Sequence, residues 1–129
     1  MSRLDNATYV ALRIVTGFLF LFHGAQKILG YFTTKPSPAA FSQMWFGGII
    51  ELVGGALIMI GLLTRPVAFL CAGTMAVAYF QFHWKLEMGA AILPIVNGGE
   101  LSVLYCFVFL LFAVKGAGPL SVDRILGRA

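Results

Sequence analysis

The feature that most constrains this chain is a succession of long apolar segments with very few charges. Residues 8–29, 45–63, 67–83 and 100–114 are almost continuously hydrophobic. The chain is 60% hydrophobic and 11% charged, whereas a soluble domain is about 45–50% apolar and about 25% charged. So few charges cannot cover the surface of a soluble fold. We therefore expect a lipid bilayer to be the solvent for much of the protein.

The bilayer also restricts the secondary structure. Lipid offers the backbone no hydrogen bonds, so a spanning segment must be a helix or part of a closed barrel. The sequence therefore predicts an all-α integral membrane four-helix bundle, with residues 1–129 forming a single domain. Residues 88–96 are too short to cross and are expected to lie along the surface. After a Gly-rich stop at residues 116–119, Ser121 is predicted to cap a short interfacial helix over residues 122–126.

The positions of the basic residues predict the orientation of the spans. The first apolar segment is too long and too charged for a cleavable signal peptide, so we expect it to span the membrane. One end of the predicted bundle holds both chain termini and more basic residues, which indicates the cytoplasmic side. Arg13 lies near this end and is expected to snorkel toward it. The basic residues on this side are Arg3, Arg65, Lys115, Arg124 and Arg128, and those on the other are Lys27, Lys35 and Lys85.

Several ionisable residues are predicted to meet in the outer half of the bilayer. Glu100 opens the last apolar segment, Glu51 lies about two turns into the second, and Lys27 lies near the end of the first. A charge at the centre of a span costs roughly 2.5–3.5 kcal/mol on insertion scales, so such residues are expected to have partners. At the same depth lie four further polar residues, His23, Gln26, His83 and Asn97.

The spacing of these residues places them on helix faces that also carry small side chains. Residues three and four apart share one face of a helix, and small residues let membrane helices approach closely. We therefore expect the charged side chains to face other helices and not lipid. The stripes are Arg13, Gly17, Phe20, Gly24 and Lys27 on the first segment, Gly47, Glu51, Gly54, Ile58 and Gly61 on the second, and Ala72, Ala76, Tyr79 and His83 on the third.

The predicted cluster supports more than one interpretation. Glu51 and Glu100 are candidate proton-handling catalytic groups, and Lys27 is a candidate stabiliser of an anionic intermediate. The structural alternative is an ion pair of Lys27 with either carboxylate that only fixes helix register. His23, Gln26, His83 and Asn97 are candidate cofactor-binding residues. A quinone resting among aromatic side chains is the expected cofactor, haem is less favoured because two histidines are a weak signal, and no metal site is predicted.

Five short motifs follow one another along the chain. They are His23-Gly24-Ala25-Gln26-Lys27, the run from Gly48 to Gly55, Gly61-Leu62-Leu63-Thr64-Arg65, Asn97-Gly98-Gly99-Glu100-Leu101 and the tail from Gly116 to Asp123. In this order the chain resembles the DoxX family of small bacterial four-helix membrane proteins over essentially its whole length. Lys115, just before the Gly-rich stop, is the one departure from the pattern.

The resemblance implies a multi-pass protein of the bacterial inner membrane. Members of the family are linked to thiosulfate:quinone oxidoreduction, to membrane oxidoreductase complexes that counter oxidative stress, and to responses to quinones or catechols. The expected function is therefore a quinone- or thiol-linked oxidoreductase subunit. The chain has no recognisable flavin motif, so electrons are expected to come from a redox partner protein or directly from the substrate.

Two other functions are compatible with the same residues. One is a non-enzymatic membrane scaffold, chaperone or small-molecule binding protein in a stress response. The other is a small-solute transporter, for which four short helices leave little room without oligomerisation. Gly54 and Gly55 are compatible with a homodimer, although they would serve internal packing equally well. The net charge of +4 is small and spread out, which argues against a nucleic-acid partner.

Overall fold

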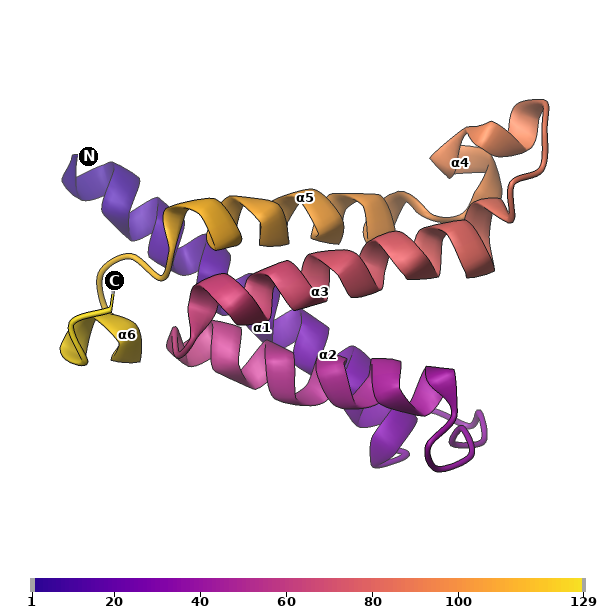
Figure 1. Cartoon of the computed structure of the whole chain (residues 1–129), viewed down its shortest axis with the longest axis horizontal. Coiled ribbons are helices and arrows are strands. Elements are labelled where there is room, and N and C mark those ends of the chain that lie inside the picture. The colour runs from indigo at the N-terminus through magenta and orange to yellow at the C-terminus, as the bar shows by residue number, and fades with distance from the viewer. Residues whose placement is uncertain (1, 129) are drawn as a thin grey trace.

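The computed structural model describes residues 2–128, and within them it is all-α and has no strand, as the sequence predicted (Figure 1). Four long helical segments are joined by one short turn, residues 61–63, and by two longer connections, residues 29–42 and 85–99. The elements in chain order are α1 (Arg3–Ile28), α2 (Gln43–Ile60), α3 (Thr64–Ala78), the π-helical turn η1 (Tyr79–Trp84), the 3-10 turn η2 (Ala90–Ile92), α4 (Pro94–Asn97), α5 (Glu100–Lys115) and α6 (Val122–Ile125).

Three helical segments in the described part of the chain are long and apolar enough to cross a membrane. They are Arg3–Ile28, Gln43–Ile60 and the continuous α3–η1 segment Thr64–Trp84. The fourth predicted span is α5, whose 16 residues extend about 24 Å, somewhat less than the roughly 30 Å of hydrocarbon in a bilayer. Residues 88–96 form only η2 and the start of α4, in agreement with a segment too short to cross.

The long helices form two closely packed pairs. Helix α1 packs mainly on α2, and α3 packs mainly on α5, while α2 and α3 touch less extensively. Figure 1 shows α2 and α3 meeting at their shared turn and diverging toward their other ends. Both chain termini lie at the end where this turn closes. We call this end of the molecule the terminal end and the opposite one the open end.

Glycines allow the backbones of α1 and α2 to touch. A β-carbon on Gly17 would lie 2.6 Å from the carbonyl oxygen of Gly55, and one on Gly24 would overlap the backbone of Leu52. The predicted packing stripe on α1 is therefore correct at these two positions. The stripe on α2 is partly wrong, because a β-carbon added to Gly47 would have no neighbour within 4 Å, while Gly48 and Gly55 meet α1.

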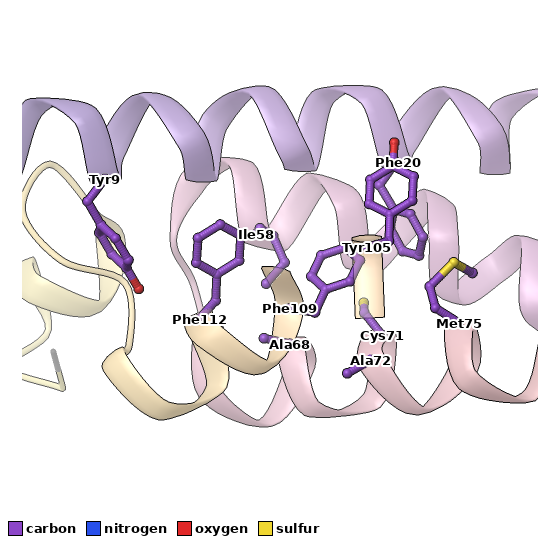
Figure 2. Close-up of a cluster of buried hydrophobic side chains, with 10 residues drawn as sticks. All are labelled: Tyr9, Phe20, Ile58, Ala68, Cys71, Ala72, Met75, Tyr105, Phe109 and Phe112. Atoms are coloured by element: carbon purple, nitrogen blue, oxygen red, sulfur yellow. The ribbon is translucent and has the colours of Figure 1, made fainter. Parts of the chain in front are cut away.

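Aromatic rings fill the space between the two helix pairs near the terminal end. Phe20, Phe109 and Phe112 are fully buried, and the Phe20 and Phe109 ring centroids lie 4.7 Å apart in an edge-on arrangement that such pairs favour. Figure 2 shows the buried cluster as a row of side chains along the bundle. Its members are Tyr9, Phe20, Ile58, Ala68, Cys71, Ala72, Met75, Tyr105, Phe109 and Phe112.

Residues 116–128, which we call the tail, are fastened to the terminal end by buried polar groups. The Arg13 guanidinium donates hydrogen bonds to the carbonyl oxygens of Ala117, Pro119 and Leu120. The Tyr9 hydroxyl donates to the Gly116 carbonyl at 2.6 Å. Arg13 is fully buried, so the expectation that it snorkels to the interface is wrong. Its two terminal nitrogens, Nη1 and Nη2, donate to the tail carbonyls, while Nε has no partner among the described residues. The position of the tail beside α1 does not follow from the local sequence pattern.

The tail also caps a helix. Leu63, in the N-cap position of α3, has no polar side chain, so the first N–H groups of α3 lack a local acceptor. The buried carboxylate of Asp123 accepts from the Leu63 and Thr64 N–H groups, each at 2.8 Å. Ser121 caps α6 by accepting from the Arg124 N–H at 3.2 Å, as predicted.

Candidate functional site

The open end holds a cavity of about 1090 Å³ between the two helix pairs. It is bounded by α1, α2, α3, η1, the start of α5 and the loop that follows α1. Most of the lining is apolar and aromatic, as in small-molecule sites generally. The polar lining includes His23, Gln26, Lys27, Glu51, His83 and Ser102. Residues from four long helical segments therefore contribute to one site in the half of the molecule away from the termini.

Lys27 and Glu51 form an ion pair in this cavity. The Lys27 ammonium donates to Glu51 Oε1 at 2.7 Å, which joins the last turn of α1 to the middle of α2. The side chain of Lys27 is 36% exposed and that of Glu51 only 5%. The structure thus selects Glu51, and not Glu100, as the carboxylate partner of Lys27.

The second oxygen of the Glu51 carboxylate is the least satisfied polar atom of the site. Glu51 Oε2 is buried and has no hydrogen-bond partner among the described residues. Buried polar atoms in proteins are almost always hydrogen-bonded, and an unpaired one costs about 1–3 kcal/mol, more if it is charged. Because Glu51 also lines the cavity, a ligand that carries an O–H, N–H or S–H group there would supply the missing donor.

Both histidines lie on the cavity, as predicted. His23 is exposed on α1, and its ring stands edge-on to Tyr105 with 6.1 Å between centroids. His83 is half-buried in η1. A π-helical turn is rare and is often found at functional sites, because the extra residue per turn redirects side chains. Gln26 also lines the cavity, and its amide donates to the Phe32 carbonyl at 3.2 Å.

Two of the predicted site residues lie outside the cavity lining. Glu100 is an exposed residue that opens α5 and forms no ion pair within residues 2–128. A carboxylate in the first turn of a helix interacts favourably with the helix dipole and can remain hydrated. The expectation of a desolvated Glu100 facing the cluster is therefore wrong. The buried stripe of α5 begins two residues later and comprises Ser102, Tyr105, Phe109 and Phe112.

Asn97 has a structural role that the sequence analysis missed. Its side-chain amide donates to the Tyr79 hydroxyl at 3.0 Å and to the Ala91 carbonyl at 2.9 Å, and its oxygen accepts from the Gly99 N–H. These bonds hold the segment between η1 and α5. Its contribution to the site is thus to position η1 and the start of α5, between which the cavity opens.

Sequence reasoning also missed two cavity residues on α5. Ser102 and Tyr105 are buried and line the cavity floor, where the Tyr105 ring lies 5.2 Å from that of Phe20. The spacing of three between Ser102 and Tyr105, continued by Phe109, is a helical stripe that could have identified them. The amide of Gln43, which also lines the cavity, donates to Gln81 Oε1 at 2.6 Å and joins the first residue of α2 to η1.

The expected quinone can be compared with the side chains that line the cavity. Tyr105 and Phe82 would supply aromatic surface for the ring, and Glu51 Oε2 would be an unpaired acceptor for a hydroxyl group. Lys27, Gln26 and the histidines supply donors for a carbonyl or phenolate oxygen. The catalytic and cofactor-binding roles assigned to individual residues remain predictions.

The fold and the site together define an α-helical membrane protein with a polar cavity that opens between two helix pairs. The chain belongs to the DoxX family, whose sequence profile matches residues 8–84. No solved structure matches the chain.

Proteins that are similar over nearly the full length of the chain support this assignment. A Haemophilus influenzae protein named "Uncharacterized protein" is 39% identical over 88% of this chain and 86% of its own length. The Escherichia coli inner membrane protein YqjF is 31% identical over 99% of this chain and 98% of its own length. The Bacillus subtilis protein named "Putative oxidoreductase CatD" is 29% identical over 95% of this chain and 90% of its own length.

Proposed function

We propose that this protein is a membrane subunit of a quinone- or thiol-linked oxidoreductase and that its reduced substrate gives a proton to Glu51. The proposal rests on the different surroundings of the two oxygens of the Glu51 carboxylate. One oxygen is held by Lys27 at 2.7 Å, and the other is buried at the cavity without a donor among the described residues. A base held in place by one oxygen and unpaired at the other is suited to accept a proton from a hydroxyl or thiol that reaches it.

The chemistry of a quinol fits the groups available. A quinol loses two protons and two electrons when it becomes a quinone. Glu51 takes one proton, and His83 or His23, which line the same cavity, takes the other. The Lys27 ammonium stabilises the anion formed after the first proton leaves. The two electrons pass to a redox partner protein. A thiol pair that forms a disulfide would release the same number of protons and electrons.

Two further observations support an amphipathic redox substrate. The cavity is largely apolar, which favours a molecule that partitions into lipid. The relative CatD, by its name a putative oxidoreductase, matches 95% of this chain.

A ligand-dependent thermal shift tests the proposal. The detergent-purified protein is titrated with short-chain ubiquinol and menaquinol analogues and with a dithiol. We expect at least one of them to raise the unfolding temperature of the wild type and of E100Q, but not that of E51Q. E100Q is the matched control because it removes the same charge outside the cavity. The absence of a shift with every compound, or an equal shift for E51Q, would refute the proposal.

A non-enzymatic scaffold or binding protein is the second candidate function. It is favoured by the fact that the Lys27–Glu51 pair joins α1 to α2 and could serve helix register alone. In that case the double variant K27M/E51Q, which removes both charges, should fold and retain the cellular function. Under the oxidoreductase proposal the same double variant folds but is inactive.

We further propose that the protein lies in the bacterial inner membrane with both termini in the cytoplasm. Both termini lie at the same end of the bundle (Figure 1), the relative YqjF is by name an inner membrane protein, and the terminal end is the more basic one. Single-cysteine variants in a C71A/C106A background test this in intact cells. An impermeant thiol reagent should label K85C at the open end and not R128C at the terminal end; the reverse pattern would overturn the orientation.

A further inference from the structure

The terminal end carries the whole net charge of the protein. Six basic and two acidic side chains lie there, whereas the open end holds three of each and is balanced. The basic residues of the terminal end are Arg3, Arg13, Arg65, Lys115, Arg124 and Arg128, and its acidic residues are Asp5 and Asp123; the open end holds Lys27, Lys35, Lys85, Glu51, Glu87 and Glu100.

The two acidic side chains of the terminal end are engaged with backbone groups. Asp5 accepts from the Ser2 N–H at 2.8 Å. Asp123 accepts from the N–H groups at the start of α3 and is buried. Arg124 and Arg128 are exposed, and neither has a carboxylate oxygen within 4 Å in residues 2–128. These two guanidinium groups are therefore available to an external anion.

An apolar groove includes the first of these arginines, Arg124, in its lining. It has a volume of about 750 Å³ and is lined by Ile60, Pro119, Val122, Arg124 and Ile125, among others. Leu120 and Ile125 at its edge are 82% and 84% exposed. Exposure of such apolar side chains to water is unfavourable in free energy, whereas contact with lipid acyl chains is favourable.

The position of the groove along the bundle matches the headgroup region. Ile60 is the last residue of α2, and the Asp123 N–H donates to the Gly61 carbonyl at 2.8 Å, which fixes α6 beside the α2–α3 turn. The ends of spanning helices lie where hydrocarbon gives way to lipid headgroups. An apolar surface at this level, beside two exposed arginines that form no ion pair within residues 2–128, has the chemistry of an interfacial lipid contact.

We propose that the groove between α2 and α6 binds an anionic phospholipid. One acyl chain lies along Ile60, Val122 and Ile125, and the phosphate pairs with the guanidinium groups of Arg124 and Arg128. The buried bonds of Arg13 and Asp123 hold the tail in place, so the groove is presented as a fixed surface and needs no ordering when lipid binds. The site is separate from the cavity at the open end, and the proposal does not depend on the oxidoreductase function.

Native mass spectrometry of the detergent-purified protein tests the lipid proposal. The protein is titrated with phosphatidylglycerol and with phosphatidylcholine of identical acyl chains. We expect phosphatidylglycerol adducts to exceed phosphatidylcholine adducts by at least about threefold, and R124Q/R128Q to bring this ratio close to one. The charge-preserving variant R124K/R128K should keep most of the preference.

Three controls distinguish lipid binding at this groove from a general attraction of anionic lipid to a basic protein. K35Q/K85Q removes two exposed cations from the open end and should leave the ratio unchanged. L120S/I125S should reduce adducts of both lipids, and glycerol phosphate, which lacks acyl chains, should not compete. The proposal is overturned if R124Q/R128Q keeps the preference, if K35Q/K85Q loses it equally, or if glycerol phosphate displaces the lipid.

Discussion

Arg13 and Leu120 are 107 residues apart in the sequence and are joined by a 2.7 Å hydrogen bond from Arg13 Nη2 to the Leu120 carbonyl oxygen. The same guanidinium also donates to the Ala117 and Pro119 carbonyls. A fully buried cation is therefore held by backbone oxygens, with no carboxylate of the described residues in direct contact. This arrangement makes the first helix and the tail one structural unit at the terminal end of the bundle.

The first prediction concerns this unit. R13M should destabilise the protein by about 2–4 kcal/mol, because buried carbonyl groups lose a charged donor. The tail should detach first, so trypsin should cut after Arg124 faster than in the wild type. R3M is the matched control, since Arg3 is exposed on the same helix. Equal cleavage rates in R13M and the wild type would contradict the anchoring role.

The second prediction concerns the ion pair at the open end. K27M should lower stability by about 3 kcal/mol, because it leaves the buried Glu51 carboxylate without its cation. E51Q added to K27M should recover most of this loss, since no buried charge then remains unpaired. Thermal unfolding in detergent can be followed in a C106S background through labelling of the fully buried Cys71 thiol. Additive losses in the double variant would show that the two side chains are not coupled.

The third prediction concerns the contact between α1 and α2. G24A should cost about 3 kcal/mol, because a β-carbon there overlaps the Leu52 backbone and the helices must separate. G47A has open space around the added carbon and should be neutral or stabilising by up to about 1 kcal/mol, since alanine is the better helix former. Unfolding temperatures of the two variants provide the comparison, and a similar loss in both would be evidence against the close contact.

The fourth prediction concerns the pH dependence of the Asp123 cap. Burial of this carboxyl acts to raise its pKa, but hydrogen bonds from the Thr64 and Leu63 N–H groups outweigh burial and hold the pKa below its ordinary value of 3.8. A group whose pKa is lowered by folding stabilises the protein fully above its unfolded pKa. That contribution is lost as the pH falls through the lower folded value.

The wild type should therefore lose stability as the pH is lowered below about 4. D123N should be less stable at neutral pH by about 1–2 kcal/mol, as expected for loss of a helix cap, and its stability should change less over the acidic range. Unfolding temperatures measured from neutral pH to about pH 2.5 provide the test. Parallel curves for the two proteins would show that Asp123 does not cap α3 as a carboxylate.

The sequence alone was sufficient for the fold class and for most of the site. Long apolar segments with 11% charged residues leave few alternatives to membrane helices, because backbone groups in lipid must be satisfied within each helix. Helical spacing then placed Lys27, Glu51, His23 and His83 at the same depth, and the structure brings them to one cavity. Depth follows from counting residues along a helix, so it is accessible to sequence reasoning.

Rotation about each helix axis and the path of the tail were decided by tertiary structure. Glu100 lies at the open end, as its place in the sequence predicted, but it is the exposed first residue of α5. Ser102 and Tyr105, further along the same helix, line the cavity. Arg13 was expected at the interface and is instead buried by carbonyls from the other end of the chain. Both outcomes depend on which neighbour fills the space beside a helix. That choice is made by packing between segments far apart in the sequence, which the local pattern of residues does not contain.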